Sequence, residues 1–143
     1  MQATTTDDFK IAIITSGFYA DLATQLTADA QAVFPNSHCF DVSGVFELPL
    51  ITQRVLRTGV YAGAVCLGLV IQGETPHFSF VARAATEGIT RVSLDLSLPI
   101  AFGVLTTDTY EQAVARVHGP KDRKGHTAAL ALKTSLLALA NLQ

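Results

Sequence analysis

The sequence predicts a single α/β domain in which helices cover both faces of a parallel β-sheet. Strand-like and helix-like segments alternate along all 143 residues, without a linker, a repeat or a low-complexity tract. The segment 62–71 is uncharged and apolar on both faces, as is typical of a central parallel strand. A chain of this length can also bury a substantial core. These three observations indicate the class of alternating α/β proteins.

The first strand and the first helix are the plainest elements. Residues 10–15 form a short, mostly apolar run that predicts a buried strand. In residues 20–34 the apolar positions recur at helical spacing, and a turn-forming Pro-Asn-Ser sequence follows them. The face expected to lie on the sheet is formed by Leu22, Leu26, Ala30 and Val33.

A short strand at 39–42 and a helix at 46–58 are expected next. The helix contains Pro49, which is tolerated in a first turn because the amide hydrogen that proline lacks would have no partner there. Gly59 is the expected stop, since glycine readily takes the left-handed conformation that ends many helices.

The central strand at 62–71 is followed by a helix that Thr75 would cap and Pro76 would open, running to Gly88. Beyond Gly88 comes a separate stretch in which apolar and polar residues alternate, up to Pro99. Its apolar members are Val92, Leu94, Leu96 and Leu98. The fourth strand is expected at 100–105.

Two helices complete the chain. Residues 108–111, Asp-Thr-Tyr-Glu, resemble a capping box that opens a helix to about residue 117. The last helix, 125–142, is apolar almost all round, except for a stripe at Thr127, Thr134 and Asn141. Such a helix is normally buried on several sides, and in so short a chain we expect another subunit to supply one of them.

The βαβα order predicts parallel strands joined by right-handed crossovers. Four strands at this spacing fit a three-layer, flavodoxin-like sandwich with a four-stranded parallel sheet. We expect the domain to span residues 10–143, and residues 1–9 to form a flexible N-terminal arm.

Composition argues against several classes of function. The net charge is −2 and basic residues cluster only at 121–124, so nucleic acid is not expected as a partner. The longest uncharged run, 60–72, is too short to cross a membrane. The first residues show no signal peptide, which favours the cytoplasm. Only 15% of residues are charged and 49% are apolar, which favours a surface buried between subunits.

The two cysteines, Cys39 and Cys66, lie in strand-like stretches and form no Cys-x-x-Cys pair, so we expect two buried, reduced thiols. No His, Cys, Asp or Glu cluster has metal-ligand spacing, and neither a Walker A loop nor a nucleophile elbow is found. Neither a metal nor a cofactor is expected.

Ligands of open parallel sheets bind beyond the carboxyl ends of the strands. The most informative segment there is 72–77, where Gly73, Glu74 and Thr75 lead into a helix N-terminus whose free amide groups favour an anion such as phosphate. His77 lies in the first helical turn, where the helix dipole disfavours an imidazolium and leaves a neutral base. An ordinary capped helix explains the same residues, so this reasoning stops at an α/β domain with a candidate phosphate-binding loop.

Four stretches in order resemble the lumazine synthase family, over residues 10–142. Ser43-Gly-Val-Phe-Glu-Leu-Pro49 resembles the family's Pro-Gly-Ala-Phe-Glu-[Ile/Leu]-Pro segment. Leu67-Gly-Leu-Val-Ile-Gln-Gly-Glu-Thr-Pro-His-Phe78 resembles its Leu-Gly-x-Val-Ile-x-Gly-x-Thr-x-His-[Phe/Tyr] signature, the most specific of the four. The segment from Phe102 to Ala113 and the later Arg116 and Lys124-Gly125 also match.

The resemblance implies a cofactor-free transferase of riboflavin biosynthesis, a 6,7-dimethyl-8-ribityllumazine synthase. It condenses 5-amino-6-(D-ribitylamino)uracil with 3,4-dihydroxy-2-butanone 4-phosphate and releases phosphate and water. By resemblance, His77 transfers protons. The substrate-binding residues it implies are Phe18, Phe46, Glu47, Leu69, Val70, Ile71, Gly73, Glu74, Thr75, Phe102, Arg116 and Lys124. Of these, Phe18 would stack on the pyrimidine, Glu47 would hold the ribityl hydroxyls, and residues 73–75 would cradle the phosphate.

The resemblance also implies a homo-oligomer, a cyclic pentamer or an assembly of pentamers. Phe102, Arg116 and Lys124 would then reach into a neighbouring subunit's site. The short, polar arm before residue 10 favours isolated pentamers or decamers over a sixty-subunit shell.

Three departures from the family pattern leave alternatives open. Gly17 and Tyr19 replace the polar neighbours of the stacking phenylalanine, Val45 replaces an alanine, and 117–120 replaces an Ala-Gly-Thr-Lys type of sequence. One alternative is an archaeal-type riboflavin synthase, which dismutates two lumazines, although the intact 73–77 loop favours the phosphate-using enzyme. The other is a flavin- or lumazine-binding assembly paralogue with weak catalysis, which only Gly17 and Tyr19 support.

Overall fold

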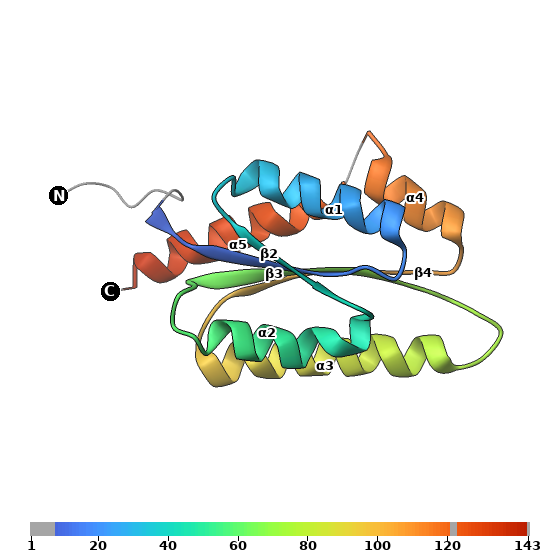
Figure 1. The fold of residues 1–143 in the computed structure, drawn as a ribbon, viewed down its shortest axis with the longest axis horizontal. Coiled ribbons are helices and arrows are strands. Elements are labelled where there is room, and N and C mark those ends of the chain that lie inside the picture. Colours follow the sequence, from blue (N-terminus) through green and yellow to red (C-terminus); the bar gives the residue numbers. More distant parts are fainter. Residues whose placement is uncertain (1–7, 121–122, 143) are drawn as a thin grey trace.

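The computed structural model describes residues 8–120 and 123–142, and it forms three layers (Figure 1). A parallel four-stranded sheet has the order β2-β1-β3-β4. The elements in chain order are β1 (Ile11–Ser16), α1 (Ala20–Val33), β2 (His38–Val42), the 3-10 turn η2 (Val45–Glu47), α2 (Leu48–Leu56), β3 (Gly63–Ile71), α3 (His77–Leu96), β4 (Ile100–Thr107), α4 (Tyr110–His118) and α5 (Lys124–Ala140). The predicted fold class is confirmed.

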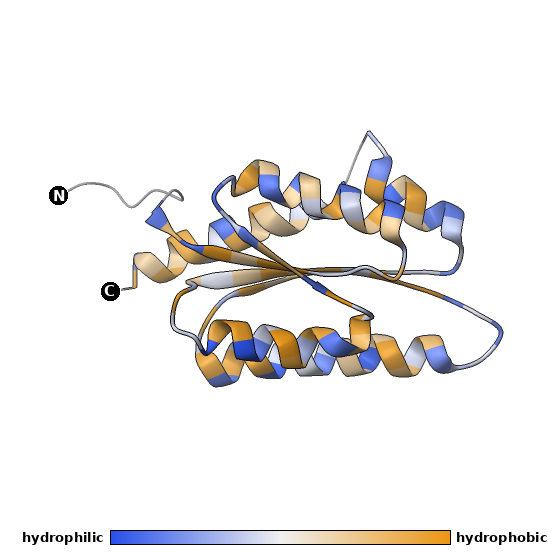
Figure 2. Ribbon diagram, viewed as in Figure 1, coloured by the Kyte–Doolittle hydropathy of each residue, from blue (hydrophilic) through white to orange (hydrophobic). Residues whose placement is uncertain are grey.

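Two apolar cores lie on the two faces of the sheet, because successive side chains of a strand point to opposite sides. In β1, Ile11 and Ile13 face α1, α4 and α5, whereas Ala12 and Ile14 face α2 and α3. Figure 2 shows apolar residues along the strands and on the helix surfaces that meet them. All four strands run in one direction, so the loops that follow them gather at a single edge.

The third helix is longer than the sequence suggested, and the prediction that it ends at Gly88 was wrong. Helix α3 continues to Leu96 and buries Ala85, Ile89 and Val92, which recur at helical spacing. Gly88 serves a packing contact instead, because a Cβ atom there would lie 2.7 Å from Cγ of Pro49 on α2. The helix ends at Ser97, whose φ of 53° is left-handed.

Two predicted caps differ from the observed ones. Thr109 rather than Asp108 caps α4: its side chain accepts a hydrogen bond from the amide of Gln112 at 3.1 Å, and Gln112 Oε1 accepts one from the amide of Thr109 at 3.2 Å. Thr75 does not cap α3, since Pro76 is the N-cap residue and no side chain bonds to that end. Pro49 lies in the first turn of α2, as predicted. The predicted end at residue 58 was wrong, because α2 stops at Leu56 with Arg57 as its C-cap, and Gly59 with its φ of 78° follows two residues later.

Helix α5 is held closely against α1. A Cβ atom on Gly125 would lie 2.3 Å from the backbone oxygen of Leu26, so only glycine permits this approach. One turn further along α1, Asp29 receives two hydrogen bonds from the guanidinium of Arg123, at 2.9 and 3.0 Å. Within the described chain α5 is not fully covered, because Leu130 and Leu139 remain exposed.

The cysteine prediction was half right. Cys66 in β3 is buried, but Cys39 is exposed on β2, which is an edge strand of the sheet formed by the described residues; neither cysteine forms a disulfide. No helix in the described ranges is long and apolar enough to cross a membrane. The predicted arm falls mostly outside the described residues, and Phe9 at its end packs against the core under α1.

Candidate active site

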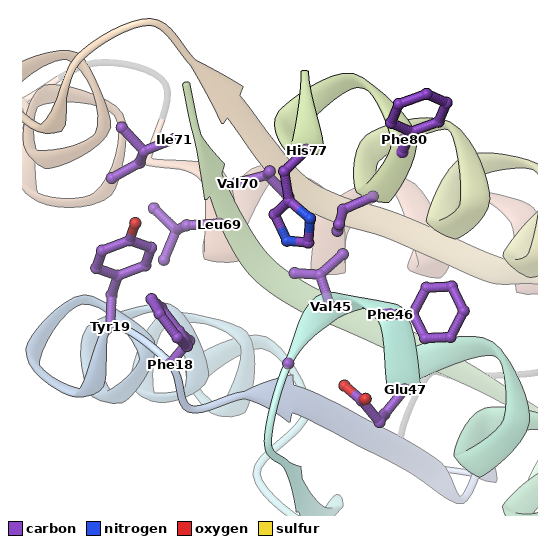
Figure 3. A pocket seen from close by; sticks show the side chains of 12 residues that line it. Phe18, Tyr19, Val45, Phe46, Glu47, Leu69, Val70, Ile71, His77 and Phe80 are labelled. Carbon is purple, nitrogen blue, oxygen red and sulfur yellow. The ribbon is translucent and has the colours of Figure 1, made fainter. Parts of the chain in front are cut away.

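A cavity of about 620 Å³ opens at the carboxyl edge of the sheet, between the loops that follow β1, β2 and β3 (Figure 3). Its position agrees with the edge that the sequence predicted. The lining is mostly apolar. It consists of Phe18, Tyr19, Gly44, Val45, Phe46, Glu47, Leu69, Val70, Ile71, His77, Phe80 and Val81.

The turn η2 packs closely against the sheet because Gly68 of β3 has no side chain. A Cβ atom on Gly68 of β3 would lie 2.8 Å from Cγ2 of Val45, so glycine leaves the room that Val45 fills. Val45 is buried there, and the next two residues, Phe46 and Glu47, are left exposed at the cavity. The Glu47 carboxylate folds back over Gly44, where a Cβ atom would come within 2.9 Å of Oε2. Valine at position 45 therefore anchors the turn.

The aromatic residue after β1 is uncovered. Phe18 is 73% exposed although it lies at the mouth of an apolar cavity, and its ring meets the edge of Tyr19 at 5.0 Å. A large exposed aromatic side chain beside a cavity marks a surface suited to a flat ligand ring. The backbone groups at the end of β3, from Leu69 to Ile71, lie across the cavity from it (Figure 3).

The loop before α3 and the first residue of the helix form the polar end of the site. The His77 ring points into the cavity toward Val45 (Figure 3). Gly73, Glu74 and Thr75 precede it in an exposed loop and do not themselves line the cavity. The loop is tied at its start by the amide of Gln72, which donates to the carbonyl of Thr107 at 2.9 Å. Because no side chain caps α3, its first amide groups remain available to an anion.

The remaining predicted residues lie elsewhere on the chain. Arg116 lines a second hollow of about 370 Å³ with Thr106, Thr107, Asp108, Gln112 and Ala115, and this hollow shares no lining residue with the first. Lys124 begins α5 close to Arg116; partial burial, and then the nearby guanidinium, lower the pKa of its ammonium group. Phe102 is exposed on the edge strand β4.

One chain thus brings seven of the thirteen predicted site residues together and leaves six outside the cavity lining. The seven are Phe18, Phe46, Glu47, Leu69, Val70, Ile71 and His77. Five lining residues were not predicted as site residues: Tyr19, Gly44, Val45, Phe80 and Val81. Helical spacing could have indicated Phe80 and Val81, which follow His77 by three and four residues and therefore share its face.

The fold and the cavity define an α/β protein that binds a small organic molecule at the carboxyl edge of its sheet. The family model of 6,7-dimethyl-8-ribityllumazine synthase matches residues 8–140, and the chain belongs to this family. It is 43% identical over 130 residues to the 6,7-dimethyl-8-ribityllumazine synthase of Nautilia profundicola, which covers 86% of this chain and 84% of that protein. It is 38% identical over 135 residues to the enzyme of the same name from Ruthia magnifica, covering 86% and 81%. The resemblance stated from the sequence is confirmed.

Proposed function

We propose that this protein is a transferase of riboflavin biosynthesis that makes 6,7-dimethyl-8-ribityllumazine. It condenses 5-amino-6-(D-ribitylamino)uracil with 3,4-dihydroxy-2-butanone 4-phosphate. The observation that carries the proposal is the cavity, which in a chain of this family joins an exposed aromatic face, a carboxylate and a histidine at an uncapped helix start.

The reaction requires little from the protein besides orientation. The primary amine of the uracil attacks the ketone, and loss of water leaves an imine. Phosphate then leaves, and the ribitylamino nitrogen closes the second ring with loss of another water. Holding two reactants in an attack geometry can contribute roughly 7–11 kcal/mol. A general acid or base contributes about 10²–10⁴-fold.

The apolar end of the cavity suits the pyrimidine. Phe18 offers an exposed ring face on which the uracil stacks, and the strand-end backbone of Leu69, Val70 and Ile71 lines the ring. Phe46 and Glu47 hold the other end of that substrate, with the Glu47 carboxylate accepting hydrogen bonds from ribityl hydroxyls.

The β3–α3 loop suits the phosphate. In the proposed site, the amide groups of Gly73, Glu74 and Thr75 and the start of α3 bind the dianion. His77 begins α3 and lines the cavity, which supports its imidazole as the group that moves protons between the two substrates in the proposed reaction.

A neighbouring subunit completes the proposed site. Arg116 and Lys124 are two close cations that do not line the large cavity of their own chain, and Phe102 is exposed on an edge strand. In the proposed assembly all three side chains enter the cavity of a second copy, where the two cations bind the phosphate. Exposed Leu130 and Leu139 on α5 are also consistent with subunit burial. We therefore propose a cytoplasmic homo-oligomer, a pentamer or an assembly of pentamers.

A turnover assay with both purified substrates tests the proposal, with release of inorganic phosphate and formation of the lumazine as the two readouts. We expect both products in equal amounts. In a parallel assay supplied with 6,7-dimethyl-8-ribityllumazine alone, formation of riboflavin would instead identify a riboflavin synthase. Tight binding of lumazine without turnover would identify a binding protein.

A further inference from the structure

Tyr19 is the last residue of the β1–α1 loop, and its phenol lines the cavity beside Phe18. We propose that Tyr19 determines substrate specificity: its hydroxyl hydrogen-bonds the polar edge of the heterocycle that stacks on Phe18. This inference rests on the proposed function, and it concerns this chain in particular, because Tyr19 departs from the family's sequence pattern.

The Tyr19 ring is fixed in place by its neighbours. Phe18 meets it in an edge-to-face arrangement with ring centroids 5.0 Å apart and an interplanar angle of 75°. On another side Tyr110, the first residue of α4, lies at 6.3 Å. The ring also packs against the core cluster under α1, and the backbone carbonyl of Tyr19 accepts a hydrogen bond from Ala23 at 2.8 Å. A ring held on this many sides can present its hydroxyl with little loss of conformational entropy.

The hydroxyl itself has no hydrogen-bond partner among the described residues, although Tyr19 lines a largely apolar cavity and Figure 3 shows its oxygen on the side of Leu69 and Ile71. Tyr61 at the opposite edge shows the usual outcome for a partly buried phenol, since its oxygen lies 2.7 Å from Nδ1 of His38. A phenol can donate one hydrogen bond and accept another, so it is able to pair with either a ring carbonyl or a ring N–H. The edge of a uracil carries both groups.

The positions of the polar groups define the expected ligand. Figure 3 shows Tyr19 and Glu47 on opposite sides of the cavity, with Phe18 between them and Leu69 beside the Tyr19 ring. A molecule that fits this order has a polar ring edge at one end and hydroxyl groups at the other, and its ring face lies on Phe18. Tyr19 therefore selects the heterocycle, whereas Glu47 selects the sugar-like chain.

The test compares Tyr19→Phe with Tyr110→Phe, which removes the same oxygen from the neighbouring ring that does not line the cavity. Equilibrium titration with 5-amino-6-(D-ribitylamino)uracil should give a Kd about 2- to 12-fold higher in Tyr19→Phe, the loss expected for one hydrogen bond. The KM for the butanone phosphate and the Tm should stay unchanged. Tyr110→Phe should match the unaltered protein in all three measurements.

Two results would overturn the inference: an unchanged Kd in Tyr19→Phe, or an equal rise in Tyr110→Phe. Failure of the proposed function is a separate outcome. If the unaltered protein binds the uracil but does not turn it over, the Kd ratio still tests Tyr19. If it does not bind the uracil at all, both the function and the inference are wrong.

Discussion

The two halves of the proposed site are built in different ways. The cavity half, formed by the loops after β1, β2 and β3 and by the start of α3, is assembled within one chain, and Glu47 and His77 line its cavity. The other half, on β4, α4 and α5, consists of long side chains such as Arg116 and Lys124 that do not line that cavity. The first half depends on packing within one chain, whereas the second, in the proposed assembly, depends on where a second copy lies.

This difference shows what holds each half in place. In the cavity half, the close approach of the Val45 side chain to Gly68 holds the turn η2, and the start of α3 positions His77. In the other half, Lys124 is placed by what flanks it: the Arg123–Asp29 ion pair on one side and the Gly125–Leu26 contact on the other. Substitutions in the two halves should therefore fail in different ways.

Replacing His77 by alanine should produce the largest effect on activity. Loss of a proton-transfer group should lower kcat by about 10²–10⁴-fold while both substrate affinities change little. Steady-state kinetics check this. His38→Ala is the control, since His38 is the first residue of β2 and lies at the amino edge of the sheet, away from the cavity at the carboxyl edge. Unchanged turnover in His77→Ala would exclude a proton-transfer role for His77.

Arg116→Ala tests the other half. We expect the KM for the butanone phosphate to rise about 10- to 100-fold and the KM for the uracil to change little, because the lost contact acts on the phosphate dianion. Equal changes in both KM values would place Arg116 outside the phosphate site.

A mixture of Arg116→Ala and His77→Ala chains, refolded together, shows whether the two halves meet between subunits. Some interfaces would then hold both intact residues, and part of the activity should return. Activity equal to the sum of the two separate variants would contradict a shared site.

Gly125→Ala should destabilise the fold by about 1–3 kcal/mol, because the new methyl group meets the Leu26 backbone, which cannot turn aside as a side chain can. Gly73→Ala is the matched control: a Cβ atom there has no other atom within 4 Å, and the expected change is below about 0.5 kcal/mol. Urea unfolding measures both. A stable Gly125→Ala protein would show that α5 can shift, and that Lys124 is less firmly placed than the contacts indicate.

Lys124→Met should give the smallest effect. The folded state lowers the pKa of Lys124, so the folded chain holds this proton less firmly than the unfolded chain does. The charged lysine therefore costs stability at neutral pH, and stability recovers as pH rises from the lowered folded pKa toward the ordinary value of about 10.4. Lys124→Met should raise the Tm at neutral pH by on the order of 1 °C. A fall in Tm without phosphate would contradict this sign.

The cavity half could be predicted from the sequence because one rule, that ligands bind at the carboxyl ends of parallel strands, depends only on where the strands end. It placed Phe18, Glu47 and His77 at one edge before any packing was known. The strand ends in turn followed from apolar runs, and the central run at 62–71 proved to be β3 almost residue for residue.

The rest required information that local patterns do not contain. Gly88 looked like a helix stop, but its purpose is contact with Pro49, a residue distant in sequence. Cys39 sits in an apolar run, yet the order of the strands leaves it at an edge. The positions of Arg116 and Lys124 relative to a complete site depend on assembly, so only the family resemblance indicated them, and their role stays a prediction.

The two cysteines differ in accessibility, and this difference can be used to measure local opening of the sheet. Burial raises the pKa of Cys66 to about 12, and its Sγ lies 3.2 Å from Thr52 Oγ1 inside the core, so the reactive thiolate is almost absent while β3 stays in the sheet. Cys39 is exposed and remains accessible. A thiol reagent should therefore modify Cys39 before Cys66, and Cys66 only at the rate at which the sheet transiently separates. The ratio of the two modification rates measures how often the sheet opens locally around β3.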